Sequence, residues 1–151
     1  MAKVDKIDQK ILSELSEDSS ISIPKLAEKI DANSSVVYSR IKRLLKNKLI
    51  ERFTIKVDDK KLGYGVKSLT GINMDSKQRD NVIQELFKIP GVREVSEVTG
   101  RFDILVTMYA KSLNDMYSVV SDDIGKIDGI IGSESFIEMK TRTKQMPYML
   151  E

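Results

Sequence analysis

The chain has 151 residues, enough for one large domain or two small ones, and its 40% hydrophobic content supports a real core. It contains no cysteine and no histidine, which excludes disulfides, thiol nucleophiles, imidazole catalysis and metal sites built from those two residue types. The formal net charge is only +2, so a nucleic-acid site would require local clustering of basic side chains.

The first residues lack the apolar core of a secretion signal, and no apolar run approaches the roughly 20 residues that cross a bilayer. We therefore expect a soluble, cytoplasmic protein with no membrane partner, no cofactor and no metal.

Basic residues cluster in one stretch of the chain. Residues 1–60 carry 13 Lys and Arg against 10 Asp and Glu, and between Arg40 and Lys56 seven basic residues accompany a single acid, Glu51. Such a cluster can bind nucleic acid, and it can equally be the solvated face of a helix.

The N-terminal part predicts three helices. Asp5 can cap a first helix, and Ser22 precedes a short second helix with Pro in its first turn. Asn33 can cap a third helix that starts at Ser34 and ends near Asn47 or Lys48. The short second helix, the three-residue turn and the third helix have the proportions of a helix-turn-helix, whose last helix lies in the DNA major groove.

A helical wheel of the third helix separates an apolar side, with Val37, Ile41 and Leu44, from a polar and basic side. Hydroxyls near the helix start can reach base edges or phosphates, and the basic side chains can neutralise phosphates. Arg40 lies between the two sides, where it can contact a phosphate or pair with an acid of the first helix. The alternative is a three-helix packing unit with a solvated basic face. The residues that we expect to contact DNA are Ser34, Ser35, Tyr38, Ser39, Arg40, Lys42, Arg43 and Lys46.

After the third helix, apolar and polar residues alternate through Phe53, Ile55 and Val57, which predicts a strand. Together with the three helices, this strand makes residues 1–57 a winged helix-turn-helix domain. Residues 58–65 combine a polar turn with two glycines and are expected to form a hinge.

Residues 66–151 have a different pattern, in which strands and helices alternate. The expected strands are Val66–Met74, Val92–Val98, Ile104–Tyr109 and Ile130–Met139, and the expected helices are Lys77–Lys88 and a helix capped by Ser112 that reaches Ile124. The order βαββαβ predicts a ferredoxin-like domain and, for the whole chain, an α+β fold. We expect the first and last strands at opposite sheet edges, and the third strand in the centre, next to the first. The open face of such a sheet is expected to be covered by a second copy of the chain.

The order and spacing of these motifs resemble the Lrp/AsnC, or feast/famine, family of transcriptional regulators over nearly the whole chain. The first helix is similar to the family's LDxxDxxIL, and the helix-turn-helix to its LAxxVGLSxxxVxxRxxRL. The turn at Thr99–Asp103 is similar to TGxYD. The family's linker is matched by Leu49-Ile50 and Leu62-Gly63-Tyr64, and its PGVxxTxT by Asp128-Gly129-Ile130 and Ser133-Glu134-Ser135.

The chain departs from the family pattern at several positions. Asp31 replaces the turn glycine and Asn33 the N-cap serine, and both substitutes suit their positions. Lys48 stands where a glycine usually ends the recognition helix. Ser133 and Ser135 replace two threonines, which keeps the hydroxyls and removes a methyl group from each.

The resemblance implies a homodimer built through the C-terminal sheets, often assembled into tetramers or octamers, and an amino-acid effector bound between C-terminal domains. The effector-binding residues that it implies are Thr99, Gly100, Arg101, Phe102, Asp103, Ser133 and Ser135. An amino acid is a zwitterion, so Asp103 and carbonyls would accept from its ammonium, while turn N–H groups and serine hydroxyls would donate to its carboxylate. The alternatives are that Gly100 only permits a hairpin turn and that Asp103 only caps it.

In the expected sheet, the third strand does not adjoin the last. One chain would then fail to bring the turn and the two serines together, and a pocket shared between subunits would be needed.

Three other functions remain to be weighed. An enzyme is not expected, because the doublets Asp58-Asp59 and Asp122-Asp123 point their carboxylates apart and no phosphate loop or nucleophile turn appears. An architectural DNA-coating protein without an effector shares the fold, as does a sensor whose helix-turn-helix has lapsed. The sequence favours a sequence-specific DNA-binding transcriptional regulator that responds to a small effector, with double-stranded DNA and a second copy of itself as partners.

Overall fold

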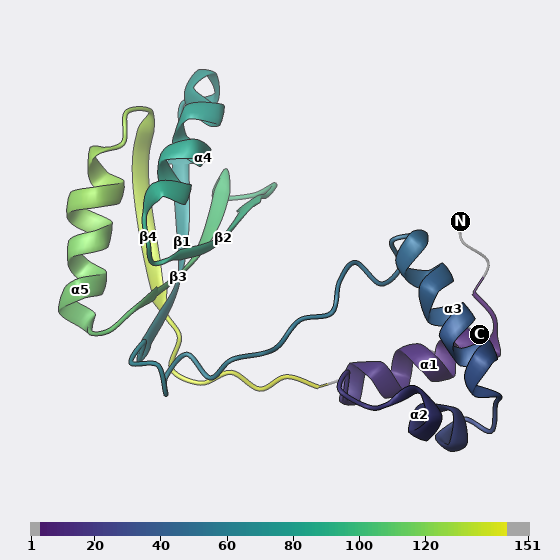
Figure 1. The fold of residues 1–151 in the computed structure, drawn as a ribbon. Helices are drawn as coiled ribbons and strands as arrows, with labels where there is room; N and C mark the ends of the chain where they lie inside the picture. The colour runs from purple at the N-terminus through teal and green to yellow at the C-terminus, as the bar shows by residue number, and fades with distance from the viewer. Residues whose placement is uncertain (1–3, 145–151) are drawn as a thin grey trace. The chain divides into compact units, whose positions relative to one another are not determined.

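The computed structural model describes residues 4–144, and the chain divides into two compact units. The described residues of the first unit are 4–56 and 143–144, and the second unit comprises Val57–Arg142. The described residues of the first unit form helices α1 (Lys6–Glu17), α2 (Ile23–Lys29) and α3 (Ser34–Lys46) (Figure 1). The helices pack around a small apolar core of Ile11, Leu26, Ala27, Ile30, Val37 and Leu44.

Side chains from the first unit cap two of its helices as predicted. The Asp5 carboxylate accepts the Asp8 N–H at 3.0 Å, and the Asp8 carboxylate accepts the Asp5 N–H at 3.1 Å, so the two acids form a capping box at the start of α1. Asn33 Oδ1 accepts the Ser35 N–H at 3.2 Å and starts α3 where the sequence predicts it.

Two residues with positive φ lie at the positions where the family uses glycine. Asp31, between α2 and α3, has φ of 53°, and Lys48, just after α3, has φ of 54°. An aspartate tolerates this left-handed backbone better than a lysine does, so the exit from α3 is the more strained of the two turns.

The strand predicted around Phe53, Ile55 and Val57 is wrong for this structure. In the described part of the chain, residues 51–57 have no strand assignment, and these three side chains are 47%, 82% and 46% exposed. The alternation of side chains is that of a strand, but a strand also needs a neighbouring strand for its hydrogen bonds, and among residues 4–144 none pairs with this segment.

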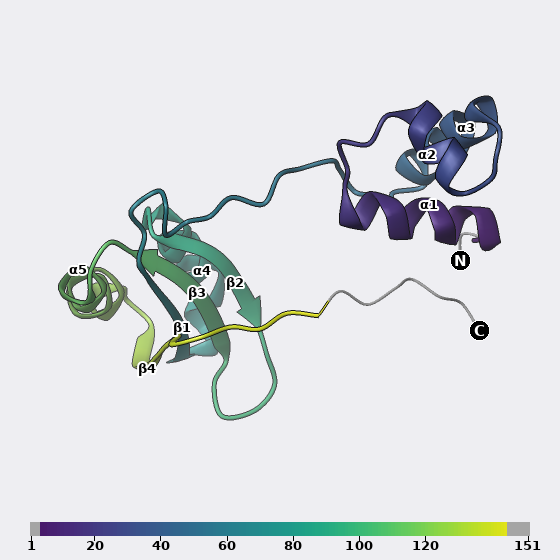
Figure 2. The same ribbon diagram turned by 90° about the horizontal axis from the view of Figure 1, so that it is seen from below.

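The second unit has the predicted βαββαβ order. Its main elements are β1 (Val66–Met74), α4 (Arg79–Lys88), β2 (Val92–Glu97), β3 (Ile104–Ala110), α5 (Leu113–Ser118) and β4 (Ile130–Ile137). A short 3₁₀ turn, Ser76–Gln78, precedes α4, and α5 continues through a π turn and a 3₁₀ turn to Lys126. The four strands form one antiparallel sheet in the order β2-β3-β1-β4 (Figures 1 and 2).

The first strand is central, which corrects the expectation that it lies at an edge. Each strand–helix–strand crossover leaves room for one strand between its two ends, so β3 enters between β1 and β2, and β1 lies between β3 and β4. β3 is central and next to β1, as expected.

The two faces of the sheet have different coverings. One face packs on α4 and α5 around a core that includes Ile72, Val82, Leu86, Val106 and Met116. In β1, Leu69 and Gly71 alternate with inward-facing residues such as Ile72. They therefore belong to the other face of the sheet, which no helix of the described residues covers.

Candidate functional site

The outward side of α3 carries a stripe of residues spaced four apart. Tyr38, Lys42 and Lys46 are exposed on successive turns, and the Lys42 Nζ lies 4.6 Å from the centre of the Tyr38 ring. Ser35 and Ser39 are exposed on the neighbouring row, whereas Ser34 is half-buried. This stripe presents hydroxyls near the start of the helix and ammonium groups further along it.

The two arginines of α3 point elsewhere, to the start of α1. Arg40 Nη1 donates to a carboxylate oxygen of Asp5 and, at 3.2 Å, to Asp8 Oδ1. Arg43 Nη2 donates to the other oxygen of Asp8. Of the two roles expected for Arg40, the structure has the ion pair with the first helix. The wheel placed Arg43 on the outer side, and its side chain is 44% exposed, but its guanidinium also pairs with an acid of α1, which the wheel did not predict.

Asp8 explains why both arginines are needed there. Its side chain is fully buried, and its two oxygens accept from Arg40, Arg43 and the Asp5 N–H. A buried carboxylate is stable only when it is paired and hydrogen-bonded, so these contacts are a condition for packing α1 on α3. Asp5 is more exposed, and its hydrogen bond from Arg40 lowers its pKa to about 2.

The loop before β3 is fixed by Asp103. Its Oδ2 accepts the Met74 N–H at 3.0 Å, and its own N–H donates to the Ile72 carbonyl at 3.0 Å. Its carbonyl accepts the Val98 N–H at 3.0 Å. Asp103 therefore joins the loop to the end of β1, which is the turn-capping alternative. Gly100 has φ of 143°, a backbone conformation that other residues rarely adopt.

The same loop crosses β1 and reaches β4. The Phe102 ring lies over Gly71, where a Cβ atom would come within 2.4 Å of the ring carbon Cδ2. Beyond it, the Phe102 and Phe136 rings meet edge to face with centroids 6.5 Å apart. Arg101 Nη2 pairs with Glu134 Oε2 at 2.7 Å. Within one chain the turn thus contacts Phe136 and Glu134 of β4, whereas the expectation concerned Ser133 and Ser135 of that strand.

The two serines of the last strand lie on the opposite face of the sheet. Ser135 pairs with Thr70, and their hydroxyl oxygens are 2.8 Å apart on the helix-covered side. Ser133 pairs with Ile72 on that same side. Side chains alternate along a strand, so Glu134, between the two serines, faces the loop instead. The seven residues implied as one effector site therefore divide between two surfaces.

Sequence reasoning missed the residues that make these junctions. Asp8 is the second acid of the LDxxDxxIL pattern and was given no role of its own, although an acid inside a helix start is a signal for a capping box or an ion pair. Gly71 lies within a strand pattern, which indicates close approach by another group. Phe136 carried no signal beyond its apolar character.

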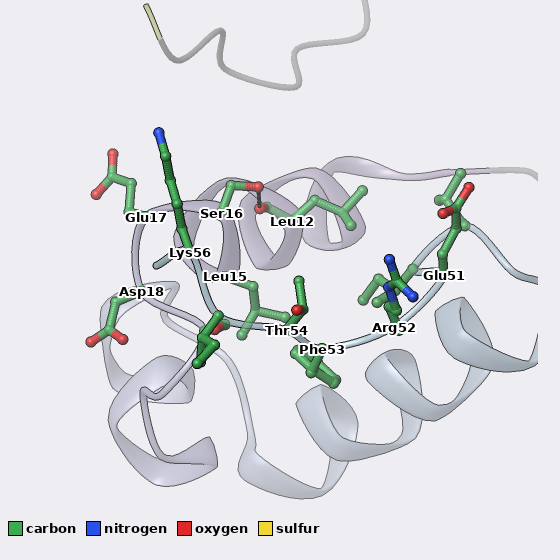
Figure 3. Close-up of a pocket in the computed structure, with 14 residues that line it drawn as sticks. Leu12, Leu15, Ser16, Glu17, Asp18, Glu51, Arg52, Phe53, Thr54 and Lys56 are labelled. Atoms are coloured by element: carbon green, nitrogen blue, oxygen red, sulfur yellow. Dashed lines mark hydrogen bonds between the residues drawn. The ribbon is translucent and has the colours of Figure 1, made fainter. Parts of the chain in front are cut away.

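An open groove of about 740 Å³ lies in the first unit, and none of the implied effector residues lines it. Figure 3 shows Leu12, Leu15 and Ser16 of α1 on one side of it and Arg52, Phe53 and Thr54 on the other. Its walls are the end of α1 and the extended segment that has no strand partner. The groove is therefore the space beside an unpaired segment.

Among residues 4–144, none of the helices combines the length and hydrophobicity that a bilayer-spanning segment requires.

Two family models match the chain. A model described as the Lrp/AsnC ligand binding domain matches residues 68–148, and one described as winged helix-turn-helix DNA-binding matches residues 4–51.

Individual relatives match over most of their length. The transcriptional regulator AzlB of Bacillus subtilis is 33% identical over 149 residues, 95% of each chain. The HTH-type transcriptional regulator LrpA of Pyrococcus horikoshii is 32% identical over 127 residues, 84% of this chain and 90% of the relative. A solved transcriptional regulator from Neisseria meningitidis, in complex with L-Met, has the same fold, with a TM-score of 0.91 at 19% identity over 97% of both chains.

Proposed function

Because this chain belongs to the Lrp/AsnC family of DNA-binding transcriptional regulators, we propose that it binds specific DNA sequences through α3 and responds to an amino acid bound by its C-terminal unit. The domain division that fits this function is the one expected from the sequence: residues 1–57 for DNA, 58–65 as a hinge, and 66–151 for effector binding and assembly.

The observation that carries the DNA proposal is the outward stripe of α3. Tyr38, Lys42 and Lys46 are exposed together, and they follow a helix start with two exposed hydroxyls, on Ser35 and Ser39. A helix with this surface suits the major groove, where lysines neutralise phosphates and hydroxyls near the helix start reach base edges.

The assembly proposal rests on the uncovered face of the sheet. Leu69 and Phe136 are 42% and 48% exposed on it, beside the half-buried Phe102 and Leu105. Apolar surface of this kind is commonly covered by another protein surface, and we propose a second copy of the chain. A dimer also presents two α3 helices to half-sites about 34–36 Å apart, or multiples of that distance.

The effector proposal is supported by the matched ligand binding domain and by the L-Met complex of the Neisseria meningitidis protein. In this chain, loop residues 99–103 with Arg101 and Glu134 offer a cation for a ligand carboxylate and an anion for its ammonium, beside two phenyl rings. Since Ser133 and Ser135 face the other way, a ligand on this loop would meet such serines only on another subunit.

The test is genomic footprinting of the purified protein, with and without a panel of the twenty amino acids. We expect discrete protected sites whose occupancy one amino acid changes, and calorimetric titration with that amino acid should show saturable binding. Discrete sites with no response to any amino acid would contradict the effector proposal and leave the DNA proposal standing.

An architectural DNA-binding role is the second candidate. The exposed stripe of α3 carries lysines rather than free arginines, and lysine contacts phosphates as a point charge more readily than it reads guanine edges. Continuous protection without discrete sites, together with a steep salt dependence, would favour this candidate.

A further inference from the structure

Four cations project from α3, and the structure divides them into two pairs. Arg40 and Arg43, here called the α3 arginines, bind carboxylates of α1. Lys42 and Lys46, the α3 lysines, are exposed, and no salt bridge found among residues 4–144 includes them. On sequence alone, all four are candidates for DNA phosphates, and Arg40 alone has an acid of the first helix as an alternative partner.

The partners of the arginines are the two acids of the α1 capping box, Asp5 and Asp8. Asp5 divides its oxygens between two tasks: Oδ1 accepts the N–H groups of Ile7 and Asp8, both at 3.0 Å, and Oδ2 accepts from Arg40. Asp8 is fully buried and accepts from both arginines. The start of α1 and the basic side of α3 are therefore one connected network.

We infer that the capping-box acids withhold the α3 arginines from DNA, so that the α3 lysines supply the phosphate-binding charge of the helix. A phosphate that captured Arg43 would have to take it from a buried carboxylate and leave that charge with one fewer partner. A phosphate that captured Arg40 would exchange one anion for another and would also approach the negative charge of Asp5. This inference rests on the proposal that α3 is the DNA-contacting helix.

The division limits how strongly the protein binds DNA of any sequence. Each phosphate contact contributes about one unit to the slope of log K against log salt. Arginines engaged with carboxylates contribute little to that slope, and Asp5 lowers the positive potential at the surface of α3. Asp5 and Asp8 thereby reduce the affinity for DNA of any sequence, while the two arginines keep their role in joining α1 to α3.

Asp5→Asn is the substitution that tests this most directly. Asparagine is as good an N-cap as aspartate, so its Oδ1 can keep the bonds to Ile7 and Asp8. Its amide nitrogen replaces the oxygen that accepted from Arg40, and a donor cannot hold a guanidinium. The variant should leave Arg40 with its 3.2 Å contact to Asp8 and free the rest of its guanidinium to pair with a DNA phosphate, while the helix cap stays in place.

The experiment measures binding of the full chain to a random-sequence DNA duplex between 50 and 200 mM salt, with circular dichroism as a check on folding. We expect Asp5→Asn to steepen the slope by about one unit, which adds a factor of about four between the two salt concentrations. Arg40→Ala should leave the slope of the wild type unchanged, and adding it to Asp5→Asn should restore the wild-type slope.

Lys42→Ala and Lys46→Ala are the matched controls and should each lower the slope by about one unit. The inference is overturned if Arg40→Ala lowers the slope of log K against log salt as much as the two lysine variants do. It is also overturned if Asp5→Asn folds and its slope is no steeper than that of the wild type. If neither lysine variant changes the slope, α3 is not the DNA-contacting helix and the proposed function itself fails at that point. If Arg40→Ala does not fold, Arg40→Gln replaces it in the same salt-dependence measurements.

Discussion

The N-terminal and C-terminal units each join parts of the chain that are far apart in sequence, but they do so with different chemistry. In the first unit, α1 and α3 are joined by a buried carboxylate, Asp8, and two arginines. In the second, the loop before β3 is joined to β4 by an aromatic ring that lies over a strand glycine, Gly71. The first junction depends on charge and the second on shape, so each should be sensitive to a different kind of substitution.

The largest effect is expected from Asp8→Asn, which removes the charge and keeps the volume. Two guanidinium groups then lose their buried partner, and the first unit should lose about 3 kcal/mol, the lower end of the range for a broken buried pair, since both arginines are partly solvated. Chemical denaturation of the full chain, with hydrogen exchange of α1 and α3 amides as the local readout, measures this. Glu28→Gln, at an exposed acid of α2, is the control, and an equally small loss in both variants would contradict the charge-based junction.

The next largest effect is expected from Gly71→Ala. The added Cβ would meet the Phe102 ring at 2.4 Å, so the ring has to leave the strand, at a cost of about 1–3 kcal/mol to the second unit. Gly132→Ala in β4 is the control, because nothing lies within 4 Å of its Cβ position. In a double-mutant cycle with Phe102→Ala, the two losses should be less than additive. Strict additivity would mean that the ring and the glycine do not depend on each other.

A smaller effect is expected from Arg101→Ala. Arg101 and Glu134 form an arginine–carboxylate pair, as Asp8 does with the α3 arginines, but these two side chains are 76% and 41% exposed. Solvent screens such a pair, so Arg101→Ala should lower the free energy of unfolding by less than about 0.5 kcal/mol at physiological salt, as measured by thermal denaturation. A loss comparable with that of Asp8→Asn would show that the second unit also depends on charge.

The smallest effect on stability is expected from lowering the pH. The Arg40 hydrogen bond lowers the pKa of Asp5 from 3.8 to about 2, so its ionised form stabilises the fold. That contribution is fully present above pH 3.8 and is lost as the pH falls toward 2. Acid titration of the wild type and Asp5→Asn should therefore show stability curves that converge between pH 4 and 2, with Arg40 and Asp8 as the charged groups facing Asp5. Curves that stay parallel across that window would exclude this contribution.

Features set by neighbouring residues were predictable from the sequence. The Asp5 and Asn33 caps and the order βαββαβ depend on residues within a few positions of each other, and the structure confirms them. The exposed stripe of α3 follows from the helical period as well. These elements also provide the pattern on which the family resemblance rests.

Features set by distant residues were not predictable in the same way. A helical wheel describes one helix alone, so it placed Arg43 on the exposed side but could not predict its partner Asp8, which lies 35 positions earlier. The position of β1 in the sheet and the separation of Ser133 from the loop depend on strand register, which alternation along one strand does not reveal. The segment at Phe53 has the side-chain pattern of a strand and lacks the neighbour that would make it one.

Hydrogen exchange of that segment, residues 51–57, can also show whether another protein surface binds along it. Among residues 4–144, no backbone hydrogen bond outside the regular elements uses an N–H group of residues 51–57, so these amides should exchange with deuterated solvent at nearly the rate of an unfolded peptide. Any surface that supplies carbonyl groups along the segment would slow the exchange of alternate amides only, because successive N–H groups point to opposite sides of an extended chain. The pattern of slowed amides would then show which edge of the segment the neighbour occupies.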